Sequence, residues 1–113
     1  MCNQTELQEL LGIFAKHMRK IFGDKLKKVI LFGSYARGDY DAESDVDVMV
    51  LVDMDKMELK RYAEDVCKAT VDIDTPYDVL LSPMLKSYEE YNKYKPVIPF
   101  LQNVEREGVN ISA

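Results

Sequence analysis

The sequence has few of the residues that mark several protein classes. Its 113 residues include two cysteines, one histidine, five glycines, four prolines and no tryptophan. Cys2 and Cys67 fit neither a disulfide framework nor a zinc-site spacing. No apolar run approaches the roughly 18 residues that span a bilayer, and the first residues lack the basic and apolar segments of a secretory signal. These absences favour a cytoplasmic globular protein with no membrane segment.

Basic residues are also in the minority. Fifteen Lys and Arg against 20 Asp and Glu give a formal net charge of −5, and an acidic surface repels polyphosphate backbones. Direct nucleic-acid binding is therefore not expected. The length predicts one domain over residues 1–113. Such a chain has no room for a separate domain that grips a substrate, so it must hold its substrate alone or with another chain.

Hydrophobic periodicity predicts alternating helices and strands. Apolar residues at three- and four-residue steps indicate a helix over residues 5–22 and others over 55–70, 84–92 and about 100–108. Strands are expected at 28–33, 45–53 and 77–82, with a short extended tail at 109–111. The fold class is therefore α/β or α+β, with a mixed sheet of three to four strands and helices packed on one face.

The first chemical feature is the turn at Gly33-Ser34, after the first predicted strand. Small residues between a strand and a helix let backbone N–H groups approach an anion, and the helix start adds its positive dipole end. The Ser34 hydroxyl and the Arg37 guanidinium can donate further hydrogen bonds to phosphate oxygens. The alternative is an ordinary turn in which Ser34 is the N-cap of the helix.

The second feature is the pair Asp45 and Asp47, which are two residues apart on a predicted strand. Strand geometry puts both carboxylates on one face, about 6.5–7 Å apart along the chain. Mg²⁺ prefers such oxygen ligands and completes its shell with waters and substrate phosphates. The alternative is two solvated acids at a strand start. However, aspartate is poorly suited to strands, and a bound cation would offset the repulsion between the two charges.

The third feature is Asp78, at the head of the predicted strand 77–82. If this strand pairs beside 45–53, Asp78 joins Asp45 and Asp47. Three carboxylates around one or two metal ions suit phosphoryl or nucleotidyl transfer. Asp72 and Asp74 are rival third ligands, ranked lower because they are expected in the loop before the strand.

Together these residues form the pattern G-S-x(10)-D-x-D, which resembles the signature of the DNA polymerase β-type nucleotidyltransferase superfamily. The stretch GSYARGDYDAESDVDVMV is similar to the core motif of the minimal nucleotidyltransferases (MNT), the antitoxins of HEPN–MNT toxin–antitoxin modules. Residues 78–83 and 99–109 are also similar to later segments of that family. The resemblance covers nearly the whole chain, but only the first motif is strongly diagnostic.

The resemblance implies a small palm-like domain that transfers AMP from ATP to a tyrosine hydroxyl on a HEPN RNase toxin, with which it forms a hetero-oligomer. Asp45, Asp47 and Asp78 would bind Mg²⁺, as two ions, and Asp78 could also act as the base. Gly33 and Ser34 would hold the β- and γ-phosphates, with Arg37 as a further phosphate contact.

Two other functions stay open at this point. The chain could neutralise its toxin by binding and masking it, without catalysis. It could also transfer a nucleotide to a small molecule, although 113 residues leave little room for the structure that would hold one.

Overall fold

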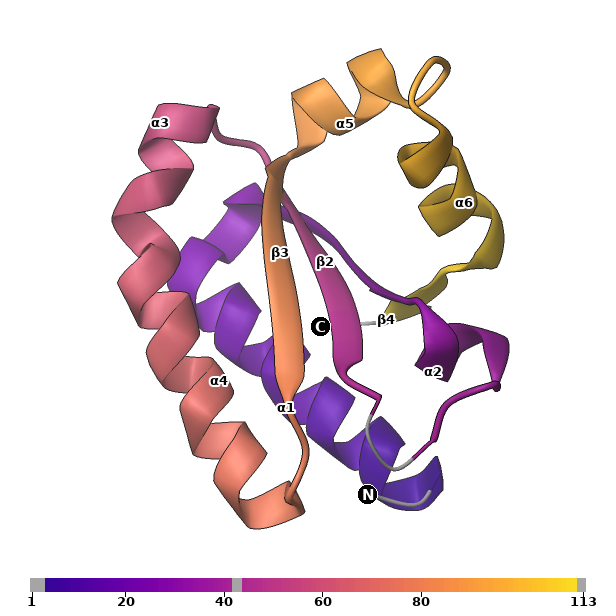
Figure 1. Ribbon diagram of the computed structural model, residues 1–113. Coiled ribbons are helices and arrows are strands. Elements are labelled where there is room, and N and C mark those ends of the chain that lie inside the picture. Colours follow the sequence, from indigo (N-terminus) through magenta and orange to yellow (C-terminus); the bar gives the residue numbers. More distant parts are fainter. Residues whose placement is uncertain (1–3, 42–43, 112–113) are drawn as a thin grey trace.

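The computed structural model describes residues 4–41 and 44–111. A four-stranded sheet with the order β3-β2-β1-β4 lies at its centre (Figure 1). β1 is antiparallel to β2 and to β4, whereas β2 and β3 are parallel. The sheet is therefore mixed, as predicted, and the extended tail supplies its fourth strand. The strands are β1 (Leu26–Phe32), β2 (Val46–Val52), β3 (Leu81–Ser87) and β4 (Val109–Ile111).

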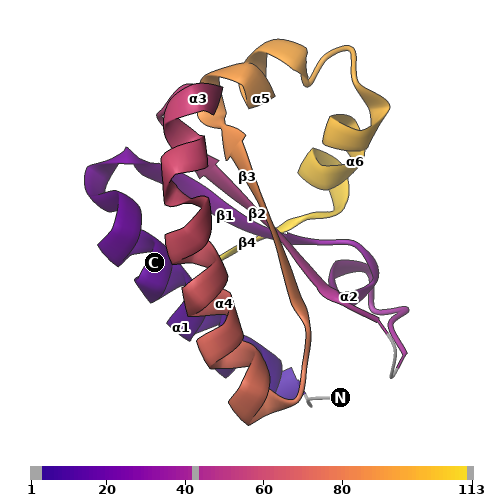
Figure 2. The same cartoon turned by 60° about the vertical axis from the view of Figure 1, so that its left-hand side comes forward.

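One face of the sheet is covered by α1 (Gln4–Phe22) and α4 (Ala63–Tyr77), which lie side by side (Figure 2). The even-numbered residues of β2, all valines, point into this layer, as the alternation in the sequence predicts. α1 contributes buried residues at helical spacing, among them Leu7, Leu10 and Phe14. No helix in the described part of the chain is long and apolar enough to cross a membrane.

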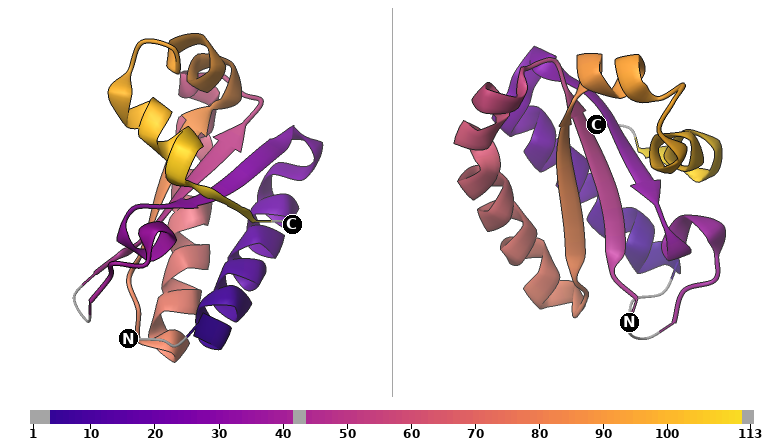
Figure 3. Two further views of the ribbon diagram at one scale, coloured as in Figure 1. Left: turned by 90° about the vertical axis from the view of Figure 1, so that its right-hand side faces the viewer. Right: turned by 45° about the horizontal axis from the view of Figure 1, so that its top comes forward.

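The opposite face is also covered, by α5 (Tyr88–Tyr94) and α6 (Pro99–Glu107) (Figure 3). A second buried cluster joins Met49 and Leu51 of β2 to Tyr91, Leu101 and Val104. The expectation that all helices pack on one face is therefore wrong. The physical reason is that β2 is apolar on both faces, so each face must be covered. The α+β class itself is confirmed.

The third strand lies further along the chain than predicted. α4 continues to Tyr77 and ends at Asp78, whose φ of 51° is in the left-handed region. β3 then begins at Leu81 and passes through Pro83, beyond the predicted end of the strand at residue 82. Because β3 is an edge strand, it tolerates a residue without an N–H group. The predicted helix 84–92 correspondingly begins later, as α5, after the N-cap Ser87.

Short helices complete the chain. A 3-10 turn (Gly23–Lys25) follows α1, and the one-turn helix α2 (Ser34–Arg37) follows β1. The predicted helix 55–70 is divided into α3 (Lys56–Leu59), a 3-10 turn (Lys60–Tyr62) and α4. Asp55 caps α3, since its side chain accepts a hydrogen bond from the N–H of Glu58 at 2.8 Å.

Candidate active site

The two halves of the G-S-x(10)-D-x-D pattern are in direct contact. The antiparallel pairing of β1 and β2 places Phe32 opposite Asp47, so the turn after Phe32 lies beside the Asp47 side chain. Gly33 has φ 77° and ψ −154°, a region that is essentially open to glycine alone. A Cβ atom at this position would lie 2.5 Å from Asp47 Oδ2. Both the backbone conformation and the approach of the carboxylate therefore require glycine here.

Asp45 and Asp47 are close enough to repel each other. Asp47 is half-buried in β2, on the face of Met49 and Leu51, and Asp45 is exposed just before the strand. Burial raises the pKa of Asp47, the charge of Asp45 raises it further, and the positive charge of Arg37 opposes both effects. Such a pair is poorly stabilised by its own surroundings, so a cation between the two carboxylates would relieve the repulsion.

The Gly33-Ser34 turn begins α2, with Gly33 rather than Ser34 as the N-cap. The carbonyl oxygen of Gly33 accepts hydrogen bonds from the N–H groups of Ala36 and Arg37, both at 3.1 Å. The alternative reading of Ser34 as the cap is therefore wrong. Its hydroxyl forms no hydrogen bond with another residue that the structure describes. A helix of one turn has little macrodipole, so an anion would depend on the hydroxyl and on Arg37.

Arg37 is held at the edge of this site by two carboxylates. Its Nε lies 3.2 Å from Asp39 Oδ2, and its Nη1 lies 3.6 Å from Glu107 Oε2. Glu107 is the last residue of α6, so this ion pair joins the turn after β1 to the carboxyl-terminal helix. Sequence reasoning missed this contact, because no local pattern links residues so far apart along the chain.

An aromatic pair lies beside Asp47. Phe32 is its partner in the β1–β2 register, and the Phe32 ring packs edge-on against Phe100 of α6, with 5.6 Å between ring centroids. On the other side of the turn, Tyr35 and Tyr40 stack with their centroids 4.1 Å apart. The two pairs flank the Gly33-Ser34 turn, and neither was predicted as part of the site.

Asp78 does not join the carboxylate pair. It lies at the exposed end of α4 instead of on a strand. Across residues 4–41 and 44–111, no three His, Cys, Asp or Glu side chains come together as a metal site. Asp72 and Asp74 lie in α4, not in a loop. Asp74 has a structural partner, since its Oδ1 accepts a hydrogen bond from the N–H of Leu81 at 2.9 Å.

Comparisons with known proteins show similarity to nucleotidyltransferases. The family model "Nucleotidyltransferase domain" matches residues 11–106. "Putative protein adenylyltransferase MJ0141" from Methanocaldococcus jannaschii is 41% identical over 108 residues, which are 94% of this chain and 99% of that protein. "Protein adenylyltransferase MntA" from Thermococcus cleftensis is 32% identical over 80 residues, which are 65% of this chain and 77% of that protein.

The fold is also shared with a solved complex, described as a crystal structure of a toxin–antitoxin with AMP-PNP. The TM-score is 0.53 at 18% identity, and the match covers 98% of this chain and 73% of that one. At this identity the likeness shows a common fold.

Proposed function

The chain belongs to the nucleotidyltransferase domain family, and we propose that it transfers AMP from ATP to a tyrosine hydroxyl of a HEPN-type RNase toxin, acting as its antitoxin. The observation that carries this proposal is the Asp47 carboxylate held against the Gly33 turn, with the charge of Asp45 beside it. The names of its relatives and the toxin–antitoxin complex of the same fold support a protein acceptor. The proposal implies a cytoplasmic complex of the chain with its toxin.

The residues at the site fit Mg²⁺. This ion takes oxygen ligands and is commonly held by one or two carboxylates together with substrate phosphates and waters. Asp45 and Asp47 offer two carboxylates whose mutual repulsion a divalent cation offsets. When bound, Mg²⁺ neutralises charge on the phosphate oxygens as the α-phosphorus is attacked. A second ion would need Asp78 as well, so its role as a third ligand stays a prediction.

The remaining residues bind and orient the nucleotide. The Ser34 hydroxyl donates to a β- or γ-phosphate oxygen, and Arg37 adds a charge-assisted hydrogen bond. A bond forms between the tyrosine oxygen and the α-phosphorus, the bond to the bridging oxygen breaks, and pyrophosphate leaves. The hydroxyl proton passes to a carboxylate. The sequence predicts Asp78 for this role, which requires Asp78 to approach the Asp45–Asp47 pair from the end of α4. Positioning and electrostatic stabilisation supply the catalysis, so no covalent nucleophile of the protein is needed.

The test is co-expression of the toxin with the wild-type chain or with Asp45→Asn/Asp47→Asn, followed by growth and by the intact mass of the purified toxin. We expect AMP on the toxin and restored growth with the wild type, and neither with the double variant. Restored growth with an unmodified toxin in both strains would instead establish masking as the mechanism.

A further inference from the structure

A groove follows the outer edge of β3, between that strand and the helices α3 and α4. Two adjoining cavities of about 280 and 490 Å³ form it, and both are lined by Ala63 and Leu85. The smaller cavity lies at the carboxyl end of β3 and the larger one extends to its start, at Leu80 and Leu81. Since a strand rises ~3.3 Å per residue, the groove is about 20 Å long.

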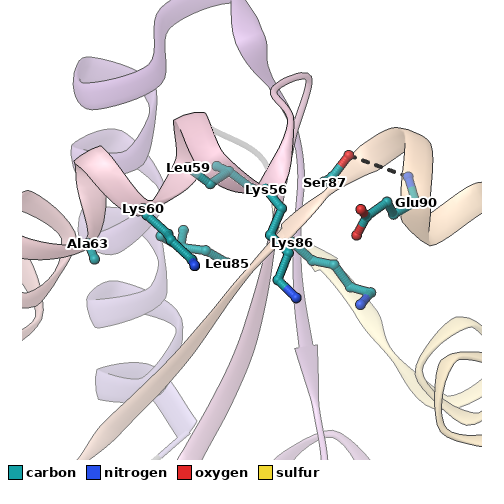
Figure 4. A pocket seen from close by; sticks show the side chains of 8 residues that line it. All are labelled: Lys56, Leu59, Lys60, Ala63, Leu85, Lys86, Ser87 and Glu90. Carbon is teal, nitrogen blue, oxygen red and sulfur yellow. Dashed lines mark hydrogen bonds between the residues drawn. The ribbon is translucent and has the colours of Figure 1, made fainter.

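The carboxyl end of the groove is basic. Lys56 of α3, Lys60 of the following 3-10 turn and Lys86 of β3 line the smaller cavity (Figure 4). None of the three forms an ion pair with any residue that the structure describes, although Glu90 lines the same cavity. In a chain with a net charge of −5, three unpaired ammonium groups in one hollow are complementary to carboxylates.

The rest of the groove is mostly apolar, with Thr70 and Asp74 as its polar members, and it ends at the start of β3. The larger cavity is lined by Val66, Pro83 and Leu85, among others. Leu80, which lies at its end, is 58% exposed. The carbonyl oxygen of Leu80 accepts a hydrogen bond from the N–H of Val46 at 2.9 Å, and Asp45 directly precedes Val46. The apolar end of the groove therefore lies beside the start of β2, which Asp45 directly precedes, while the Asp47 side chain lies on the opposite face of the sheet.

We propose that this groove docks the acceptor segment of the protein substrate, a stretch with aliphatic side chains that ends in a cluster of carboxylates. The carboxylates bind Lys56, Lys60 and Lys86, and the aliphatic side chains cover the apolar floor. The acceptor hydroxyl then passes the start of β3 to reach Asp45 and, beyond the sheet edge, Asp47. This inference rests on the proposed function and adds the chemistry by which the acceptor is recognised.

The strand register sets the spacing that such a segment needs. Lys86 is the β3 partner of Leu51, and Ser82 is the partner of Asp47, so four residues along β3 separate Lys86 from the position opposite Asp47. This corresponds to ~13 Å along the strand. An extended acceptor segment spans that distance with about four to six residues between its hydroxyl and its carboxylates.

Synthetic peptides test this recognition. One peptide carries a single tyrosine, a short aliphatic stretch and three glutamates about five residues from the tyrosine, and its matched control has glutamines in place of the glutamates. Transfer from α-labelled ATP is measured with the wild type, with Lys56→Glu/Lys60→Glu/Lys86→Glu, and with the charge-matched control Lys16→Glu/Lys20→Glu/Lys27→Glu. The three control lysines are exposed and line neither cavity of the groove.

We expect the wild type and the control variant to prefer the glutamate peptide at least tenfold in kcat/KM, and the groove variant to lose that preference. Equal rates on both peptides with the wild type would overturn the proposal, as would an unchanged preference in the groove variant.

A binding measurement separates this inference from the proposed function. Cys67 is exposed and lines the larger cavity, so a fluorophore attached to it in a Cys2→Ser chain reports occupancy of the groove without any reaction. Lysine-dependent binding of the glutamate peptide with no AMP transfer supports the groove and contradicts the proposed function. AMP transfer without lysine-dependent binding contradicts the groove proposal and supports the proposed function. If neither binding nor transfer is observed, both proposals are overturned.

Discussion

The carboxylate of Asp47 lies directly over the backbone of Gly33, where a Cβ atom would be only 2.5 Å from Oδ2. This contact fixes the distance between the turn that would hold the phosphates and the carboxylates that would hold the cation. Effective catalysis of group transfer depends on such fixed positions. The contact therefore explains why a glycine and an aspartate so far apart in the sequence form one site.

Gly33→Ala should damage both stability and activity. Its backbone conformation costs a residue with a Cβ about 1–3 kcal/mol, and the new methyl group displaces the Asp47 carboxylate. We expect a lower free energy of unfolding in urea and loss of AMP transfer. Gly12→Ala is the matched control, because a Cβ there meets no atom within 4 Å in α1. This variant should be about 0.5–1 kcal/mol more stable. An active Gly33→Ala chain would contradict this account of the turn.

Asp47→Asn should stabilise the metal-free chain at neutral pH while abolishing transfer. Burial and Asp45 raise the pKa of Asp47 above its ordinary value of 3.8. The ionised carboxylate therefore destabilises the folded state above its folded pKa, and this cost disappears as the pH falls towards 3.8. Unfolding in urea with EDTA should show the variant more stable than the wild type at pH 7, with a smaller difference near pH 4.

Mg²⁺ supplies the second arm of that experiment. It should stabilise the wild type, because a ligand that binds only the folded state raises the free energy of unfolding, and it should leave Asp47→Asn unchanged. A variant less stable than the wild type at pH 7 without metal would contradict the assigned repulsion.

Asp74→Ala should destabilise the junction between α4 and β3. The Asp74 carboxylate accepts the N–H of Leu81 at 2.9 Å, and a buried donor left without a partner costs about 1–3 kcal/mol. Asp74→Asn should be nearly neutral, since its amide oxygen can accept the same bond and burial already raises the pKa of the acid. Asp72→Ala, at an exposed position of the same helix, is the control. If Asp74→Asn lost activity but not stability, a chemical role for this acid would replace the structural one.

Arg37→Gln should weaken nucleotide binding with little change in stability. Its ion pairs with Asp39 and Glu107 are exposed, and such pairs contribute about 0–1 kcal/mol. We expect the KM for ATP to rise about tenfold, because one charge-assisted hydrogen bond to phosphate is lost. Glu107→Gln removes a partner of Arg37 but no phosphate contact, so its effect on KM should be smaller. An unchanged KM in Arg37→Gln would remove this residue from the site.

Local patterns predicted the parts of the fold that local chemistry decides. The alternation of β2 and the spacing from Gly33 to Asp47 were visible in the sequence, and the structure confirms the valine face and the contact between the two motif halves. The residue at which α4 ends could not be predicted from such patterns. The left-handed conformation of Asp78 and the bond from Leu81 to Asp74 set that boundary, and both depend on how α4 meets β3.

The covering of the second sheet face could not be predicted from local sequence patterns either. Met49 and Leu51 are fully buried only because Tyr91 and Leu101 reach them from segments about 40–50 residues further along the chain. The ion pair of Arg37 with Glu107 depends on the same packing of α6. Contacts of this kind follow from the tertiary arrangement and leave no local pattern.

Purified components test the proposed AMP transfer without other cellular proteins. The wild-type chain and Asp45→Asn/Asp47→Asn are each incubated with α-labelled ATP and the toxin, with Mg²⁺ or with EDTA. We expect label on a toxin tyrosine only for the wild type in the presence of Mg²⁺. Equal labelling by the double variant, or no labelling by a folded wild-type chain bound to its toxin, would contradict the proposed function.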